Sequence, residues 1–545
     1  MRSSQLLGIL PCWLYTTSFI LLLLGQSWAE NAQSPLQAED QAKRIAIIGA
    51  GSAGSSTAYY LQTYADFFSV PINITVFERA NYIGGRSTTV NVFDDPTQPI
   101  ELGASIFVEV NTNLMKAAKR HNLKFKGAGD DTPDEATDTL GIWDGSEFVF
   151  RQKNATFRWW NIVKVLWKYG WSPMRTQSLM KSTVEKFLKM YKWPYFPFKS
   201  LSEVAVSTGL VEAAWATGAE FLKENHISEQ FSREIIQAST RVNYGQNLQL
   251  IHGLETMVCM ATDGAVSIEG GNWQIFQGML NTSRATLKLE SPVTELHRNA
   301  DNTYKITSKS GKDSEQAMFD HVVIAAPFQF SNITVLPPLQ HPPDTIPYVD
   351  LHVTLFASPH KLAPQFFKLR PQDSVPEVVL STLPKGLKLG AQRDGVGPAG
   401  FWSISTLRKA RAPSGYPTTA PSKDHYVYKV FSPRRLTAEF LSKLLNVEMD
   451  TAGNGENLTI ADMSASDIGW YHEKVWQSYP YLYPRITFED IQLAPNLWYT
   501  SGIESFISTM ETSSLAGKNV AALIMSNWIE NFDLKLKLTD FTWLV

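Results

Sequence analysis

The sequence predicts an α/β fold in which a domain built on a parallel sheet is interleaved with a second, α+β domain. Residues 44–49 form a short, continuously apolar run that ends in glycine, as a central parallel strand does. A helical stretch to about residue 68 and a β-branched strand at 72–78 follow, which completes one βαβ unit. A mainly helical region at 157–224 precedes further strand patterns at 285–296, 304–308, 321–326 and 349–356. Because strands bracket the helices, we expect each domain to be assembled from non-adjacent segments.

These changes of pattern predict the domain boundaries. The first domain is expected to comprise residues 44–112, 265–335 and 485–530. The second domain is expected to comprise residues 113–264, which are mainly helical, and residues 336–484. Residues 30–43 are then a linker and residues 531–545 a C-terminal tail.

The N-terminus has the features of a secretory signal peptide. Residues 6–25 are almost entirely apolar, follow Arg2, and lead into the small-x-small sequence Ser27-Trp28-Ala29. This order predicts a signal peptide at residues 1–29 that is cut after Ala29, although the apolar run is also long enough for an uncleaved anchor. Cleavage would remove Cys12 and leave Cys259 as the only cysteine, so no internal disulfide could form.

Five Asn-x-Ser/Thr sequons agree with passage through the secretory pathway, and each alone is a weak signal. We expect an N-glycosylated protein of the lysosome or vacuole, or of the extracellular space. The sequons are at Asn73, Asn154, Asn281, Asn332 and Asn457.

The composition excludes several classes of protein. The 545 residues are 44% hydrophobic, which is enough for a packed core and excludes disorder, a disulfide scaffold and a collagen-like fibre. The 49 basic and 52 acidic residues are nearly balanced, and a dedicated nucleic-acid binder would need a basic excess. The 16 Trp, 19 Tyr and 29 Phe residues are sufficient for a large apolar pocket as well as for ordinary core packing.

The glycine-rich turn after the first strand predicts a dinucleotide site in a Rossmann-like domain. The turn reads Gly49-Ala50-Gly51-Ser52-Ala53-Gly54, in which the glycines serve a tight turn, a close approach to a pyrophosphate, and helix–strand packing. An acid, Glu78, stands at the end of the next strand, where it can bond both ribose hydroxyls. The motif alone is weak, but its position between a strand and a helix makes it specific.

A second set of motifs distinguishes FAD from NAD. Gly84-Gly85-Arg86-Ser87 follows Glu78 closely, and here the sequence resembles the superfamily of FAD-containing amine oxidases and disulfide reductases. Glu101-Leu102-Gly103-Ala104-Ser105 resembles the segment of that superfamily that passes the flavin ring. Residues 320–327 are similar to its later strand, and Val293 to the residue whose backbone meets the adenine.

The C-terminal part extends the resemblance. Met510-Glu511-Thr512 begins a helix whose N-terminus, in the superfamily, points at the N1/C2=O edge of the flavin and stabilises the reduced anion. The usual Gly-Asp pair is replaced by Gly502-Ile503-Glu504. The role of Glu504 therefore stays open between a contact with the ribityl chain and an ordinary surface position.

The resemblance is closest to the prenylcysteine oxidase (prenylcysteine lyase) family, and it extends from about residue 44 to residue 528. It rests on Arg241-Val242-Asn243-Tyr244-Gly245-Gln246, on Val266-Ser267-Ile268-Glu269-Gly270-Gly271-Asn272, on Leu351-His352-Val353-Thr354-Leu355, and on the C-terminal motifs above. The motifs and the resemblance together imply the cofactor-binding residues Gly49, Ala50, Gly51, Ser52, Ala53, Gly54, Glu78, Arg79, Gly84, Gly85, Arg86, Gly103, Ala104, Ser105, Val293, Gly502, Glu504, Met510, Glu511 and Thr512.

The resemblance also implies an activity. It implies a Rossmann-like FAD-binding domain, an α+β substrate-binding domain, and oxidative cleavage of the thioether of farnesyl- or geranylgeranyl-cysteine, with O2 as the final acceptor. Because sulfur and the allylic system stabilise the cation that forms, this reaction needs orientation and a dry flavin face more than a strong acid or base. Two alternatives are an FAD-dependent amine oxidase and a non-catalytic binder of prenyl lipids, although the intact nucleotide motifs argue against the second.

No other catalytic or metal-binding motif is found. HExxH, CxxC and GxSxG are absent, so the sequence predicts no metal site and identifies no catalytic side chain. Cys259 and His352 are interpreted as packed residues. Lys181, Lys186, Lys189 and Lys192 are open to two interpretations, a solvated helix face or peripheral contact with an anionic membrane. We expect a monomer.

Overall fold

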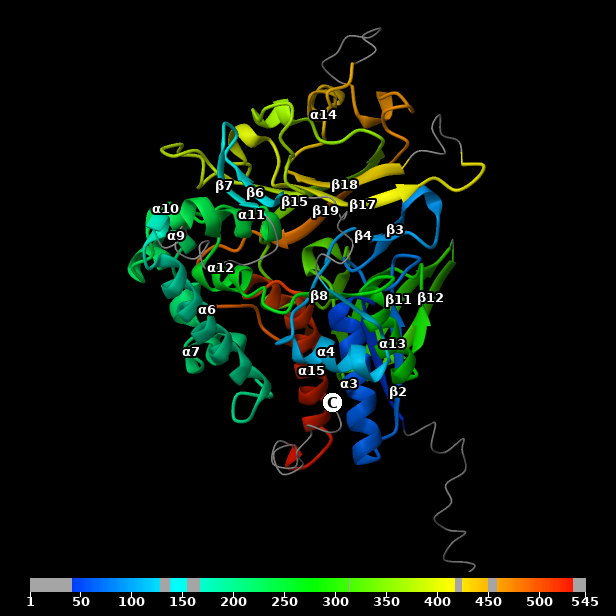
Figure 1. The fold of residues 1–545 in the computed structure, drawn as a ribbon. Helices are drawn as coiled ribbons and strands as arrows, with labels where there is room; N and C mark the ends of the chain where they lie inside the picture. Colours follow the sequence, from blue (N-terminus) through cyan, green and yellow to red (C-terminus); the bar gives the residue numbers. More distant parts are fainter. Residues whose placement is uncertain are drawn as a thin grey trace, which may run out of the picture.

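The structure is a computed structural model that describes residues 42–127, 138–153, 167–311, 313–416, 424–448 and 458–532 (Figure 1). The expected signal peptide, the sequons at Asn154 and Asn457, and nearly all of the C-terminal tail lie outside these residues. Within the described ranges, no helix combines the length and the apolar content that crossing a membrane requires.

A six-stranded sheet forms the centre of the first domain. Its order is β20 (Gln492–Ala494), β21 (Leu497–Tyr499), β13 (His321–Ile324), β1 (Lys43–Ile48), β2 (Ile72–Phe77) and β9 (Thr286–Lys288). The strands from β21 to β9 run parallel, and β20 pairs antiparallel at one edge. Ile45, Ala46 and Ile47 of β1 are fully buried, because helices and a second sheet cover the faces of this sheet. The α/β fold with a parallel sheet that the sequence predicts is confirmed.

Two helices from opposite ends of the chain pack together beside this sheet. They are α3 (Ser52–Phe68) and α15 (Met510–Ser526), drawn in blue and red in Figure 1. A Cβ atom at Gly517 would lie 2.3 Å from the carbonyl oxygen of Ala53, so glycine is what allows this close approach. Ser56 Oγ also donates to Ser514 Oγ across 2.8 Å. The helices α4 (Thr112–Arg120) and α13 (Trp273–Ser283) complete this layer.

The expected strand at 285–296 is two strands of different sheets. Residues 286–288 form β9 of the parallel sheet, whereas β10 (Val293–Arg298) belongs to a four-stranded sheet. The chain turns between them at Glu290, whose φ is +50°, and at Pro292, which cannot donate to a ladder. The order of the second sheet is β12 (Asp313–Phe319), β11 (Tyr304–Ser310), β10 and β14 (Thr334–Leu336).

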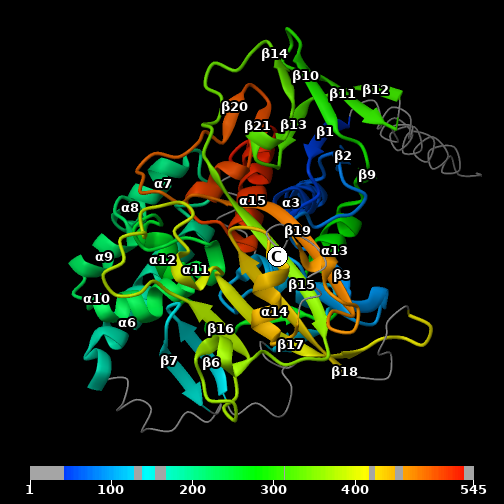
Figure 2. The ribbon, with the colours of Figure 1, turned by 90° about the horizontal axis from the view of Figure 1, so that it is seen from above.

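The second domain contains a seven-stranded sheet and a group of helices on one flank (Figure 2). The sheet order is β19 (Trp470–Pro480), β15 (Tyr348–Ser358), β18 (Asp424–Ser432), β17 (Ser403–Arg411), β16 (Val378–Ser381), β6 (Asp138–Trp143) and β7 (Phe148–Lys153). The sequence predicts only β15 among these strands. The helices on this flank are α6 (Ser172–Leu188), α7 (Leu201–Ser207), α8 (Val211–Ala214), α9 (Gly218–Glu224), α10 (Glu229–Phe231), α11 (Gln237–Tyr244) and α12 (Gly253–Met260). A further helix, α14 (Ala438–Leu445), packs separately against the sheet.

Two short ribbons join the larger units. They are β3 (Thr89–Asn91) with β4 (Pro99–Glu101), and β5 (Phe125–Gly127) with β8 (Val266–Ile268). The second ribbon pairs strands from the expected segments 113–264 and 265–335, which the sequence assigns to different domains.

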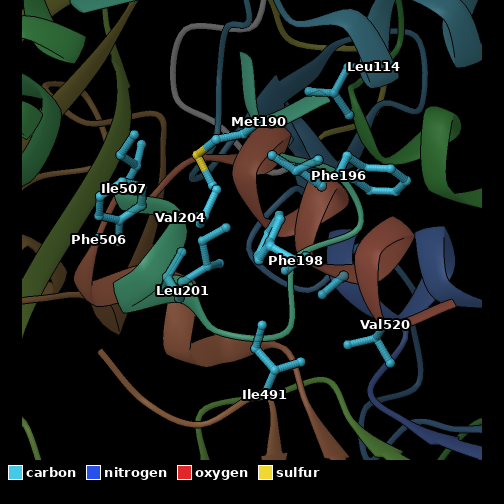
Figure 3. Packing of buried hydrophobic residues seen from close by; sticks show 14 of the residues in the cluster. Leu114, Met190, Phe196, Phe198, Leu201, Val204, Ile491, Phe506, Ile507 and Val520 are labelled. Atoms are coloured by element: carbon cyan, nitrogen blue, oxygen red, sulfur yellow. The ribbon is translucent and has the colours of Figure 1, made fainter. Parts of the chain in front are cut away.

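The largest hydrophobic cluster surrounds α15 (Figure 3). Phe196 and Phe198, which belong to the aromatic-rich stretch at 193–198, are buried in it. Asn519 of α15 holds this stretch in place, because its side chain accepts from the backbone N–H of Phe198 and donates to the carbonyl of Phe198, both at 2.8 Å. These two rings are therefore core residues.

Candidate cofactor site

The candidate site lies at the carboxyl edge of the parallel sheet, where β1, β2, β13 and β21 end together. Ligands of open α/β sheets bind at this edge. Gly49 leaves β1 with φ +112°, and its N–H donates to the carbonyl of Phe77 at 2.8 Å. A Cβ atom at Gly49 would lie 2.8 Å from the carbonyl oxygen of Ala325 at the end of β13. Only glycine fits this turn.

The other two glycines of the motif have different surroundings. A Cβ atom at Gly54 would lie 1.9 Å from the carbonyl oxygen of Gly49, so Gly54 brings α3 against the turn. A Cβ atom at Gly51 would have only the Cα of Gly85 within 4 Å, at 3.9 Å. Gly51 is also the N-cap of the 17-residue helix α3, and no side chain caps it. A Cβ atom at Gly51 would thus meet no close contact beside the N-terminus of a helix, where an anionic group is stabilised.

Glu78 stands directly after β2 and faces this turn. Its Oε2 accepts from the N–H of Ala50 and its Oε1 from the N–H of Ala80, both at 2.8 Å. The carboxylate thus fixes the glycine-rich turn as well as its own loop, and each oxygen keeps a second lone pair for a hydroxyl donor. Arg79 donates from Nη1 to the carbonyl of Phe330 at 2.8 Å.

Arg86 and Glu504 form an ion pair that joins two distant motifs. Nη2 of Arg86 donates to Oε1 of Glu504 at 2.6 Å, and Nη1 donates to the carbonyl of Ser478. The Tyr348 hydroxyl donates to Oε2 of Glu504 at 3.3 Å. Although burial lowers the pKa of the Arg86 guanidinium, Glu504 holds it above its ordinary range. Glu504 is 3% exposed, so the interpretation as a surface glutamate is wrong.

The segment at 101–105 lies against the Gly84-Gly85-Arg86 turn. A Cβ atom at Gly103 would be 2.3 Å from the carbonyl oxygen of Arg86, and the N–H of Ala104 donates to the same oxygen at 3.2 Å. Gly84 and Gly85 both have positive φ, at +93° and +59°. These contacts bring two of the expected cofactor-binding segments together.

The N-terminus of α15 approaches the same region. Ser52 Oγ donates to the carbonyl of Met510 at 2.6 Å. Thr509 and Thr512 form a capping box at the start of the helix. A pocket lined by Tyr348, Tyr499, Ser501, Gly502 and other residues opens beside Glu504.

Two of the expected cofactor-binding residues, Glu511 and Val293, are engaged in contacts within the protein. Oε1 of Glu511 accepts from Asn113 N–H and from the Tyr191 hydroxyl, and Oε2 accepts from Leu114 N–H. Glu511 thereby binds the start of α4. Val293 is the buried first residue of β10 and pairs with Ser308. That both residues contact a cofactor stays a prediction.

The sequence does not predict a buried polar cluster beside the start of α15. The Tyr244 hydroxyl donates to the carbonyl of Ser508 at 3.1 Å, and the N–H of Ser508 donates to Oε2 of Glu255 at 3.2 Å. Burial raises the pKa of Glu255 to about 8, and Oε1 has no hydrogen-bond partner. Cys259 is buried nearby, and burial raises the pKa of its thiol. Tyr244 belongs to the segment 241–246 that carries the family resemblance, and no local sequence pattern indicates that Glu255 is buried.

The residues at this edge fit a dinucleotide such as FAD. The space in front of Gly51, the uncapped start of α3, and the carboxylate of Glu78 correspond to a phosphate, its helix N-terminus and a ribose. Among the described residues, no group of three or more His, Cys, Asp and Glu side chains is placed to hold a metal ion.

Comparisons with known proteins agree with this geometry. The family model described as "Prenylcysteine lyase" matches residues 152–535, and an "NAD(P)-binding Rossmann-like domain" matches residues 47–120. "Farnesylcysteine lyase" of Arabidopsis thaliana is 29% identical over 510 residues, which cover 90% of each chain. "Prenylcysteine oxidase 1" of Homo sapiens is 28% identical over 521 residues, again 90% of each.

Solved structures show the same fold at low identity. Putrescine oxidase bound to putrescine superposes with a TM-score of 0.54 at 13% identity, covering 89% of this chain and 99% of that one. A fatty acid isomerase from P. acnes gives 0.51 at 14% identity with the same coverage. Since the family model covers well over half of the sequence, the chain belongs to the prenylcysteine lyase family.

Proposed function

We propose that this protein is an FAD-dependent prenylcysteine oxidase that cleaves S-farnesyl- or S-geranylgeranyl-cysteine during the breakdown of prenylated proteins. Family membership carries the proposal, and curated relatives named farnesylcysteine lyase and prenylcysteine oxidase support it. The complete nucleotide site at Gly51, Glu78 and Arg86 supports a redox enzyme rather than a carrier of prenyl lipids.

The reaction consumes water and O2. The carbon between sulfur and the double bond loses a hydride, water adds to the resulting cation, and the hemithioacetal divides into a prenyl aldehyde and cysteine. When bound, FAD supplies the hydride acceptor, and O2 is reduced to H2O2 as the cofactor is reoxidised.

The chain's own residues bind and orient the cofactor in this scheme. The start of α3 at Gly51 holds the phosphates and Glu78 holds the ribose. The Arg86–Glu504 pair fixes the turn at 84–86 against the loop before α15. The N-terminus of α15 stabilises negative charge on the reduced ring.

The remaining proposals concern the setting of the enzyme. Asn73, Asn281 and Asn332 are exposed, which supports glycosylation in the secretory pathway and a lysosomal, vacuolar or extracellular location. We infer a monomer that contacts anionic membranes through α6 and the chain before it. Trp167, Trp171 and Met174 are exposed there, although Lys186 is paired with Glu212.

Anaerobic titration of the purified flavoprotein tests the function. S-farnesylcysteine should bleach the flavin absorbance without air, and should yield H2O2 and farnesal with air. Putrescine and other amines should leave the spectrum unchanged. A protein that contains FAD but is bleached only by an amine would establish the amine oxidase instead, and a protein without FAD would exclude both oxidases.

A further inference from the structure

Lys429 is a buried lysine at the junction of the two domains. It lies on β18 of the seven-stranded sheet and is 8% exposed, whereas lysines are almost always at the surface. Its Nζ donates to the carbonyl oxygen of Glu101 at 2.7 Å and to the hydroxyl of Ser105 at 3.0 Å. Nζ also lies 4.9 Å from the centre of the Phe431 ring. An ammonium group from the second domain therefore reaches the first domain at residues 101–105.

The carboxyl group of Glu101 is held close to this lysine. Its Oε1 accepts from the N–H of Asn272 at 2.5 Å, whereas its Oε2 is buried without a hydrogen-bond partner. Asn272 also donates from Nδ2 to the carbonyl of Ala104 at 2.9 Å. Burial raises the pKa of Glu101 and lowers that of Lys429, so the charged form of each side chain is destabilised by desolvation.

Both partners of Lys429 belong to one segment. Glu101 and Ser105 enclose Gly103, whose backbone lies against the Gly84-Gly85-Arg86 turn, and the N–H of Gly84 in turn donates to the carbonyl of Ala50 in the glycine-rich turn at 2.9 Å, so the segment lies at the candidate cofactor site. A neutral side chain could fill the same space with less desolvation, so the retained ammonium points to a charge that it stabilises. Reduction of the flavin places negative charge on the ring.

We propose that Lys429 is a positioning residue of the redox site, which holds residues 101–105 against the flavin ring and stabilises the reduced ring by its positive charge. This proposal rests on the proposed FAD-dependent function. The seven-stranded sheet of the second domain would thereby contribute to the electrostatic stabilisation of the cofactor.

The reduction potential of the bound flavin tests the proposal, because a merely structural lysine would not change it. Lys429→Gln keeps hydrogen-bonding capacity but removes the charge, so the potential should fall and anaerobic bleaching by S-farnesylcysteine should slow roughly tenfold. Lys429→Arg keeps the charge and should restore most of the potential. Lys409→Gln, at an exposed lysine on the neighbouring strand β17, should leave the potential unchanged.

A second variant keeps the test decisive if Lys429→Gln fails to fold. Glu101→Gln removes the neighbouring negative charge, leaves Lys429 in place, and should raise the potential. An unchanged potential in folded, FAD-containing Lys429→Gln, or in Glu101→Gln, would overturn the proposal. Because the reduction potential needs only bound FAD, it tests the role of Lys429 separately from the proposed function. The proposed function fails if the flavin of the wild-type protein does not react with the thioether.

Discussion

Arg86 and Glu504, which are 418 residues apart in sequence, meet as an ion pair at 2.6 Å at the edge of the cofactor site. The pair joins the turn after β2 to the loop before α15, so it closes the site across both ends of the chain. Tyr348 of the second domain adds its hydroxyl to the same carboxylate.

Replacing Glu504 by Gln should weaken both the fold and the site. The Arg86 guanidinium would lose its buried counter-charge, and because its side chain is 34% exposed we expect a loss of only about 1–2 kcal/mol in the free energy of unfolding. Urea denaturation measures this loss, and gel filtration measures FAD retention. Glu473→Gln, which breaks the more exposed pair with Arg435, is the control. Equal losses in the two variants would contradict the role of Glu504.

Gly51 and Gly54 should respond differently to replacement by alanine. The Gly54 methyl group would collide with the carbonyl of Gly49, so Gly54→Ala should lower the free energy of unfolding by about 3 kcal/mol. The Gly51 methyl group enters open space, so Gly51→Ala should cost less than about 1 kcal/mol in the FAD-free protein yet lose FAD binding. Thermal unfolding and flavin absorbance separate the two effects. Normal flavin content in Gly51→Ala would show that no phosphate lies there.

The buried carboxyl group of Glu255 should make stability depend on pH. Burial raises its pKa to about 8 in the folded protein, so between about pH 5 and pH 8 the folded state binds a proton that the unfolded state has released. Stability from this group therefore falls as pH rises. Glu255→Gln removes this titration. The free energy of unfolding of the variant, relative to that of the parent, should therefore rise by up to about 1.4 kcal/mol per pH unit in this window.

Urea denaturation of both proteins at pH 5, 6, 7 and 8 measures this difference. His252, whose pKa burial lowers to about 4, is present in both proteins, so its own titration cancels. If the difference in the free energy of unfolding between parent and variant were the same at all four pH values, Glu255 would be ionised in the folded protein.

The exposed apolar side chains at the start of α6 should bind membranes. The proposed membrane-binding face consists of Trp171 and Met174 at the start of α6 and of Trp167, which lies outside that helix, before the left-handed Gly170 (φ +60°). Trp167 is 91% exposed and Trp171 is 69% exposed. A Trp171→Ser, Met174→Ser double variant should cosediment roughly tenfold less with phosphatidylserine vesicles. Trp215→Ser changes an exposed tryptophan outside this face and should bind normally. Equal binding by both variants would exclude this face.

The sequence predicts the nucleotide-binding half of the fold better than the substrate-binding half. The strand at 44–49, the helix to Phe68 and the helix from Met510 are recognisable because local pattern and glycine chemistry determine them. The strand β19 escapes prediction because its apolar residues do not alternate regularly and because it pairs with β15, more than a hundred residues away. The burial of Glu504 is equally hidden, since only the distant Arg86 compensates its charge.

The packing of α15 on α3 bears on how the protein matures. The glycine-rich turn leaves the ribosome well before residues 510–526, which form the helix that completes the site. A nascent chain that has not reached α15 therefore carries the glycine-rich turn without the helix that packs on α3. Flavin loading is accordingly expected only after α15 has been synthesised, and chains that terminate before α15 should be colourless.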